Sequence, residues 1–126
     1  MRTKQSRTPG ARVARVGSVI RREVAALVPA AVDDPRVAGA TFTEVDISPD
    51  LKQARIYVTH YRGEEAAHEA VRALNRASSH LRRILAPRLS LRVTPQLVFL
   101  YDPSVDQGFR IDALIRKARN EDGTTS

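Results

Sequence analysis

The stretch Thr41–Thr59 reads TFTEVDISPDLKQARIYVT, and its patterning decides the fold. Both halves of this stretch alternate apolar with polar residues, which is the period of a strand that buries one face. Between the halves, Ser48-Pro49-Asp50 has the composition of a turn, because proline pre-sets its own φ. Two alternating runs around a short turn predict an antiparallel hairpin. The residues expected on its inner face are Thr43, Val45, Ile47, Ala54, Ile56 and Val58.

The segment before the hairpin has helical spacing. Its apolar residues recur at intervals of three and four, so they share one face of a helix. Gly17 lies within this segment and weakens the helix by about 1 kcal/mol relative to alanine, so packing must hold it. Pro29 is expected to end the helix near Val28, because the residue before a proline disfavours helical dihedral angles. The apolar stripe consists of Val13, Val16, Ile20, Val24, Leu27 and Val28.

A second helical region follows the hairpin. Gly63-Glu64-Glu65 opens it, and early glutamates suit the positive end of a helix dipole. Helical spacing then continues to Pro87, but Ser78 and Ser79 lie in the middle, where adjacent serines bend a helix. We therefore expect two helices that meet at a kink. Their apolar residues are Ala67, Ala70, Val71, Leu74, Ala77, Leu81, Ile84 and Leu85.

A third strand is predicted over residues 91–101. Pro95 lies on its apolar face and cannot donate a ladder hydrogen bond, which predicts a sheet edge or a bulge. A short helix around Ile111, Leu114 and Ile115 is expected to follow. The order predicts an α+β domain with one three-stranded mixed sheet and helices on one side. The apolar face of the third strand carries Leu91, Val93, Leu97, Phe99 and Tyr101.

Length and composition indicate one small domain. The 126 residues are 42% hydrophobic and contain no cysteine, which excludes disulfides and thiolate chemistry. We expect a flexible basic arm over residues 1–10, a domain over 11–116 and a disordered tail over 117–126. The chain lacks an apolar run of membrane-spanning length and the apolar core of a signal peptide, so we expect a cytoplasmic protein without a membrane partner.

The charge balance predicts a polyanionic partner. Lys and Arg total 21 against 14 Asp and Glu, a formal net charge of +7. Arginines gather around the expected kink, where guanidinium groups fork onto phosphates and the first N–H groups of a helix point outward. Small residues at the kink would let a sugar–phosphate backbone approach. The expected RNA-binding residues are Arg72, Arg76, Ala77, Ser78, Ser79, Arg82, Arg83, Arg88 and Arg92, with Arg12 and Arg15 of the first helix. An ordinary solvated basic face explains the same residues equally well.

No pattern in the sequence predicts catalysis. The histidines His60, His68 and His80 lack metal-ligand spacing, and no serine has a recognisable base beside it, so we expect no catalytic residue, metal or cofactor. The tyrosines, Tyr57, Tyr61 and Tyr101, are expected to pack on strands. The carboxylates Glu44, Asp46 and Asp50 would either pair with Arg55 or mark a contact with a basic partner.

An ordered series of short motifs runs from Arg12 to Leu114. The longest is VDISPDLKQARIYV over residues 45–58, and Arg12-Val13-Ala14 and Asp34-Pro35-Arg36 precede it. Downstream stand Leu91-Arg92, Pro95, Leu97, Phe99, Tyr101-Asp102, Ser104, Gly108, Ile111 and Leu114. In this order the motifs resemble the bacterial ribosome-binding factor A family.

The resemblance implies a KH-like fold of type II, with an Ala-x-Gly helix–kink–helix in place of the usual GxxG loop. Here Ala77-Ser78-Ser79 occupies that position, and we expect Ser79 to cap the second helix. The family implies a non-catalytic, monomeric maturation factor that binds the free or immature 30S small ribosomal subunit and its rRNA. It also implies assistance in late assembly and in 5′-end processing of 16S rRNA, growth in the cold, and a functional link to a ribosome-associated GTPase.

Two other interpretations stay open. A general KH-like RNA-binding or ribosomal protein without an assembly role would co-sediment with translating ribosomes. A protein–protein adaptor with an acidic partner would ignore RNA.

Overall fold

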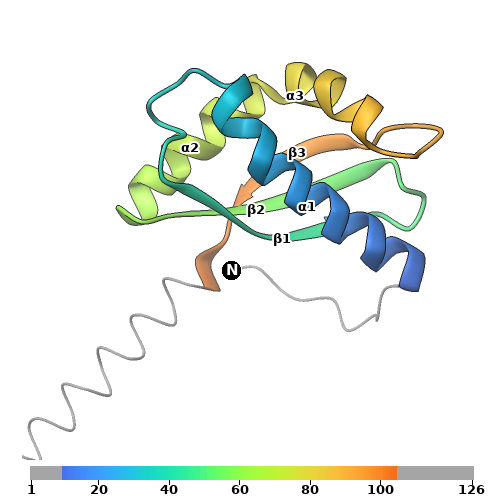
Figure 1. Cartoon of the computed structure of the whole chain (residues 1–126). Helices are drawn as coiled ribbons and strands as arrows, with labels where there is room; N and C mark the ends of the chain where they lie inside the picture. Colours follow the sequence, from blue (N-terminus) through green and yellow to red (C-terminus); the bar gives the residue numbers. More distant parts are fainter. Residues whose placement is uncertain (1–9, 105–126) are drawn as a thin grey trace, which may run out of the picture.

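The computed structural model describes residues 10–104, and they form an α+β fold. The helices lie together on one side of a three-stranded sheet (Figure 1), so the predicted fold class is confirmed. The elements are α1 (Ala11–Ala31), β1 (Ala40–Ile47), β2 (Gln53–His60), α2 (Glu64–Arg76), α3 (Ser78–Leu85), the 3-10 turn η1 (Ala86–Arg88) and β3 (Gln96–Tyr101).

The strands have the order β1-β2-β3, with β1 antiparallel and β3 parallel to the central β2. The predicted hairpin and mixed sheet are therefore confirmed. The turn is fastened by Asp50, whose Oδ1 accepts hydrogen bonds from the Ser48 hydroxyl at 2.7 Å and the Lys52 N–H at 3.0 Å. These bonds also hold the pKa of Asp50 below its ordinary value.

The expected inner face of β1 is wrong at one position. The register shifts between Phe42 and Glu44, so Thr43 is the extra residue of a β-bulge. Phe42 takes the inward place and is buried, with Val45 and Ile47 still packed against the core. The Thr43 hydroxyl instead donates to the buried carboxylate of Asp102, just after β3. The bulge thus connects the two edge strands through side chains.

Helix α1 lies on the sheet through the predicted stripe, with Ile20, Val24, Leu27 and Val28 buried. Gly17 is buried too, and a Cβ there would lie 3.1 Å from the Val45 carbonyl oxygen. The absence of a side chain at Gly17 thus allows α1 to lie close to β1. The helix does not end near Val28 but runs to Ala31, with Pro29 in its last turn. Val28 is buried in the core, and the Val32 N–H closes this turn onto the Val28 carbonyl oxygen at 3.0 Å.

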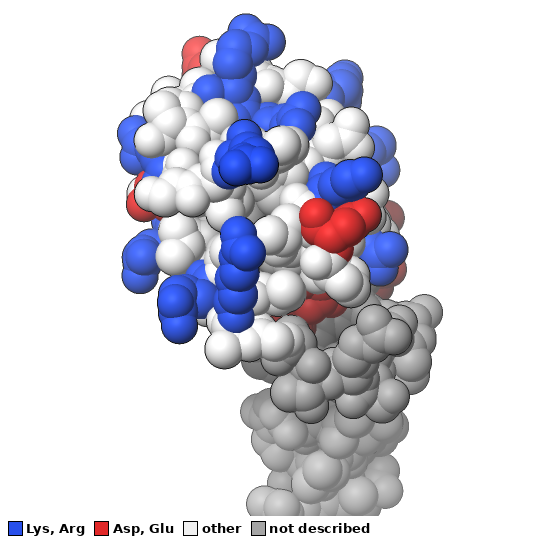
Figure 2. Space-filling model, turned by 90° about the vertical axis from the view of Figure 1, so that its right-hand side faces the viewer, with Lys and Arg blue, Asp and Glu red and all other residues white. Residues whose placement is uncertain are grey.

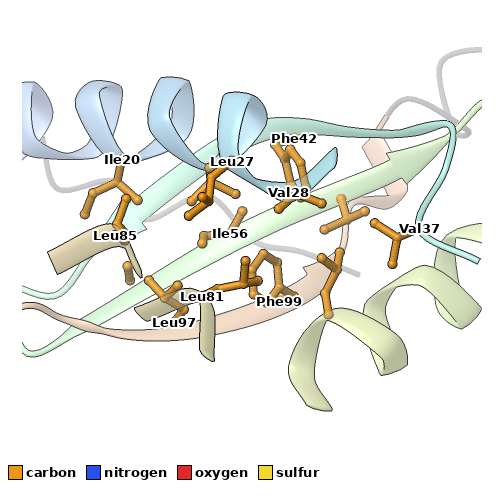
Figure 3. Packing of buried hydrophobic residues seen from close by; sticks show 14 of the residues in the cluster. Ile20, Leu27, Val28, Val37, Phe42, Ile56, Leu81, Leu85, Leu97 and Phe99 are labelled. Atoms are coloured by element: carbon orange, nitrogen blue, oxygen red, sulfur yellow. The ribbon is translucent and has the colours of Figure 1, made fainter. Parts of the chain in front are cut away.

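The core lies between the helices and the sheet (Figure 3). Ile20 and Leu27 from α1 and Leu81 and Leu85 from α3 point toward Phe99 and its neighbours on the strands. The buried residues of the second helical region are Ala67, Ala70, Ala73, Leu74, Leu81 and Leu85, while Val71, Ala77 and Ile84 pack partly against them.

The third strand is shorter than predicted. It begins at Gln96, and the preceding residues form an irregular segment in which Val93 is 60% exposed. Pro95 is buried before the strand starts, and Arg82 of α3 binds the Thr94 carbonyl oxygen, which draws this segment toward α3. β3 is an edge strand, as Pro95 predicted.

Residues 1–9 of the arm expected over 1–10, the helix around Ile111 and the tail over 117–126 lie outside the described residues. Within residues 10–104, no helix is long and apolar enough to cross a membrane.

Candidate nucleic-acid interface

The kink between α2 and α3 consists of a single residue. Ala77 has φ −91° and ψ 1°, and its N–H bonds back to the carbonyl oxygens of Ala73 and Leu74, both at 3.1 Å. Its own carbonyl oxygen accepts from Leu81 N–H at 2.9 Å, so α3 begins at once. These dihedral angles are open to any L-residue. A kink therefore forms here without the glycine that the family resemblance places in this motif.

The expected capping role of Ser79 is wrong. Ala77 is the N-cap of α3, without a side-chain capping bond, and Ser78 is the first helical residue. Ser79 lies inside the first turn with its side chain exposed, and Ser78 is half-buried. The first-turn N–H groups of a helix lack acceptors within their own helix. Two small side chains thus border the positive end of α3, which leaves room for a phosphate group.

On the α2 side of the kink, Arg72 and Arg76 are exposed and one turn apart. Because the helix breaks at Ala77, these two residues form a ridge that does not continue to Arg83. Arg76 also lies within the electrostatic reach of Asp34 and helps to lower its pKa. Arg36 is the main cause of that shift to about 2, through hydrogen bonds from its side chain at 2.7 and 3.0 Å and from its N–H.

On the α3 side, the predicted arginines differ in what they contact. Arg82 is half-buried, and its Nε and Nη2 donate to the Thr94 carbonyl oxygen at 3.0 and 2.6 Å. Arg88 lies 3.3 Å from a carboxylate oxygen of Glu23 on α1. Arg83 and Arg92 are exposed and have no ion pair or side-chain hydrogen bond to another described residue.

Six of the exposed cations lie at one end of the molecule, which we call the basic end. Figure 2 looks onto this end, where α1 begins and α3 finishes, and basic side chains are spread over it with few acidic ones between them. Residues 70–101 contain six arginines and no aspartate or glutamate, a pattern that can be read from the sequence alone. The basic end comprises Arg12, Arg15, Lys52, Arg83, Arg88 and Arg92.

The opposite end is acidic. It is formed by the loop of residues 32–39, the β2–α2 turn and the first turn of α2 (Figure 1). Its carboxylates are Asp33, Asp34, Glu64 and Glu65. Its cations are Arg62 and Arg36, which pairs with Asp34 at 2.7 Å, and the charge of Arg76 at the end of α2 also reaches Asp34. The charges are therefore separated along the molecule, and a polyanion is attracted to the basic end.

The remaining candidate residues are the three histidines and the carboxylates of the hairpin. His60 is buried, His68 forms a 3.5 Å pair with Glu64, and His80 is exposed on α3. Across residues 10–104, no group of three or more histidine and carboxylate side chains is placed to hold a metal ion. In the hairpin register Asp46 lies opposite Arg55, whose Nε donates to Gln53 Oε1 at 3.3 Å, so pairing of the hairpin carboxylates with Arg55 stays a prediction.

The chain matches the family model described as ribosome-binding factor A over residues 12–115. It is also 46% identical over 108 residues to the ribosome-binding factor A of Azoarcus sp. strain BH72, with 86% of each chain covered. The chain belongs to the ribosome-binding factor A family. Members of this family are ribosome-binding factors and not enzymes, which confirms the prediction that the chain has no catalytic role.

Solved structures of the family share the fold. The crystal structure of ribosome-binding factor A from Thermus thermophilus has a TM-score of 0.62 and 35% identity, covering 71% of this chain and 94% of its own. Coordinates of a homology model of the Thermus thermophilus protein, as fitted into the cryo-electron-microscopy map of a 30S–RbfA complex, have a TM-score of 0.60 and 34% identity. They cover 72% of this chain and 96% of their own.

Proposed function

We propose that this protein binds the 30S small ribosomal subunit through the phosphates of its rRNA. The observation that carries the proposal is the acid-free run of residues 70–101, which places exposed arginines on both sides of the kink and over the basic end. The fit of a relative into a 30S–RbfA map supports the same partner. In the proposed complex, phosphates lie at the first turn of α3 and along the basic end, with Arg72, Arg76, Arg83, Arg88 and Arg92, helped by Arg12 and Arg15.

Arg82 has a structural role in this interface as well as an electrostatic one. Its guanidinium holds the segment before β3, so it contributes its charge while fixing the position of Arg92. Most contacts of this kind go to the sugar–phosphate backbone and position the protein, without reading base sequence.

We further propose that binding assists late assembly of the subunit and 5′-end processing of 16S rRNA without any chemistry at this site. A bound protein shifts an RNA folding equilibrium only if it has higher affinity for one arrangement. The protein would hold rRNA helices while neighbouring segments settle, and it would leave when the mature arrangement binds it less well. The family resemblance supports a monomer that acts in the cytoplasm, in the cold, with release linked to a ribosome-associated GTPase.

Gradient sedimentation tests this function. In lysate of a strain that lacks the protein, we expect unprocessed 16S rRNA to accumulate, and restoring the protein should remove it. The restored protein should be substoichiometric and enriched on free small subunits. Co-sedimentation with translating ribosomes at full occupancy, with normally processed 16S rRNA in the deletion strain, would instead indicate a ribosomal protein without an assembly role.

A further inference from the structure

Tyr61 was expected to pack on a strand, but it lies just beyond β2 with 80% of its surface exposed. It is at the acidic end of the molecule, where its N–H approaches the Gly39 carbonyl oxygen at 3.4 Å. Most large apolar side chains in residues 10–104 are buried or half-buried, and an aromatic ring left this open is a typical contact residue of interfaces. It is not part of the basic end.

One face of this ring rests on a buried side chain. It stacks on His60, with ring centroids 5.0 Å apart and planes inclined by 23°. His60 is 4% exposed and fixed by two hydrogen bonds, because Nε2–H donates to the Ala38 carbonyl oxygen at 2.7 Å and Nδ1 accepts from Arg62 N–H at 3.1 Å. Such a ring loses little conformational freedom when a partner binds.

Gly39 completes the support. Its φ of +92° is a conformation that L side chains rarely adopt, and a Cβ there would overlap the Tyr61 ring. The glycine therefore lets the ring lie directly against the backbone of the loop 32–39. One face of the ring is covered by His60, and the exposed fraction leaves the other side to solvent.

The charges around the ring select the partner. Glu64 and Glu65 are exposed in the adjoining helix turn, and Asp33 is exposed in the loop. Asp34 and Arg36 neutralise each other, the other nearby cations are Arg62 and Arg76, and Glu69 lies near enough to act on Arg36. The local charge is thus negative, which repels phosphate and attracts a guanidinium or ammonium group. Such cations also bind the face of a tyrosine ring.

We propose that Tyr61 anchors a docking surface for an arginine- or lysine-rich protein segment. One cationic side chain of the partner lies on the open face of the ring, and another faces Glu65 in the first turn of α2. The protein would then contact RNA at its basic end and a basic polypeptide at its opposite end. The stacking and the charges around Tyr61 do not depend on the proposed RNA interface.

A peptide titration tests the chemistry. The probe is a fluorescently labelled decapeptide of alternating arginine and glycine. Its anisotropy gives the affinity of every variant, and NMR shifts of the Tyr61 ring locate the contact in the unaltered protein. Tyr61→Ala should weaken binding about 3- to 10-fold, Tyr61→Phe should bind as the unaltered protein does, and Glu65→Gln should bind more weakly. Equal affinity of Tyr61→Ala, or ring shifts with a single-stranded RNA oligonucleotide but not with the peptide, would overturn the proposal.

Photo-crosslinking tests the same contact on purified small subunits. With p-benzoylphenylalanine in place of Tyr61, we expect a crosslinked product that resists ribonuclease and maps to an Arg/Lys-rich peptide. The same photoreactive residue in place of Arg92 serves as the control and should crosslink to rRNA. A product at position 61 that contains rRNA, or no product there while position 92 crosslinks, would refute the docking surface. If the photoreactive residue at position 92 does not crosslink to rRNA, that result would contradict only the proposed RNA interface.

Discussion

At the scale of single residues, the neighbouring arginines Arg82 and Arg83 have different structural roles. Arg82 donates two hydrogen bonds to Thr94, whereas Arg83 is exposed with no such bond to a described residue. We predict that Arg82→Gln lowers the free energy of unfolding by about 1–3 kcal/mol, because the Thr94 carbonyl loses a charged donor. Arg83→Gln should stay within about 0.5 kcal/mol. Urea unfolding of the two variants measures this, and equal stabilities would contradict the anchoring role.

Asp34 gives a second prediction at this scale. Its pKa of about 2 depends first on the Arg36 hydrogen bonds, so Arg36→Ala should move it back toward 3.8. Because the folded pKa is lowered, the stabilising effect is fully present above pH 4 and is lost as the pH falls from about 4 to 2. NMR titration of the carboxyl carbon measures both values. A midpoint near 3.8 in the unaltered protein would show that the pair does not form.

At the scale of elements, α1 depends on the absence of a side chain at Gly17. A Cβ there would lie 3.1 Å from the Val45 carbonyl oxygen and 3.6 Å from Ile47 Cγ1. We predict that Gly17→Ala lowers stability despite its higher helix propensity, and that Gly17→Val lowers it by about 1–3 kcal/mol. The control is Ser18→Ala, an exposed neighbour that should be neutral or slightly stabilising. A gain of about 1 kcal/mol for Gly17→Ala would mean that the close approach imposes no constraint.

The free edge of β3 carries another testable feature. Asn75 of α2 pairs with the strand as a further strand would, donating to the Phe99 carbonyl oxygen at 2.9 Å and accepting from its N–H at 2.8 Å. Asn75→Ala should cost about 1–2 kcal/mol and expose a strand edge that can pair with another copy. Arg72→Ala, an exposed position on the same helix, is the control. Sedimentation velocity should show self-association of the Asn75 variant only; a monomeric variant would contradict the edge-protecting role.

Sequence patterns predicted the helices, the hairpin and the kink, because the spacing of apolar residues and the chemistry of turns are local properties of the chain. The stripe of α1, the Ser48-Pro49-Asp50 turn and the break near Ser78 all depend on residues a few positions apart. Two predictions were wrong because the residues concerned bind side chains that are distant in the sequence. Thr43 leaves the inner face because its hydroxyl binds Asp102, and residues 91–95 leave the sheet because Arg82 binds Thr94. The helix end predicted near Val28 was wrong as well, since α1 runs to Ala31 with Pro29 in its last turn.

At the scale of the whole molecule, the charges are separated between two ends. The arginines can be read from the sequence but their separation from the acids cannot, because the distribution of charge over a surface follows from topology. The α2–α3 crossover carries the acid-free residues 70–101 toward the start of α1, while Glu64 and Glu65 stay at the opposite end with the loop 32–39. Tyr61 was misplaced for a related reason, since β2 ends at His60 and leaves the next residue outside the sheet.

The salt dependence of binding to purified small subunits tests the central claim most directly. The test variant carries Gln at Arg76, Arg83 and Arg92, and the control carries Gln at Arg21, Arg55 and Arg62, which are also exposed but lie elsewhere. Both variants lose the same charge. We predict that the test variant binds more weakly and that its slope of log affinity against log salt is shallower by about 2–3, roughly 0.7–0.9 for each lost phosphate contact. The control should keep the slope of the unaltered protein. Equal slopes for the two variants would contradict an RNA interface at the kink and the basic end.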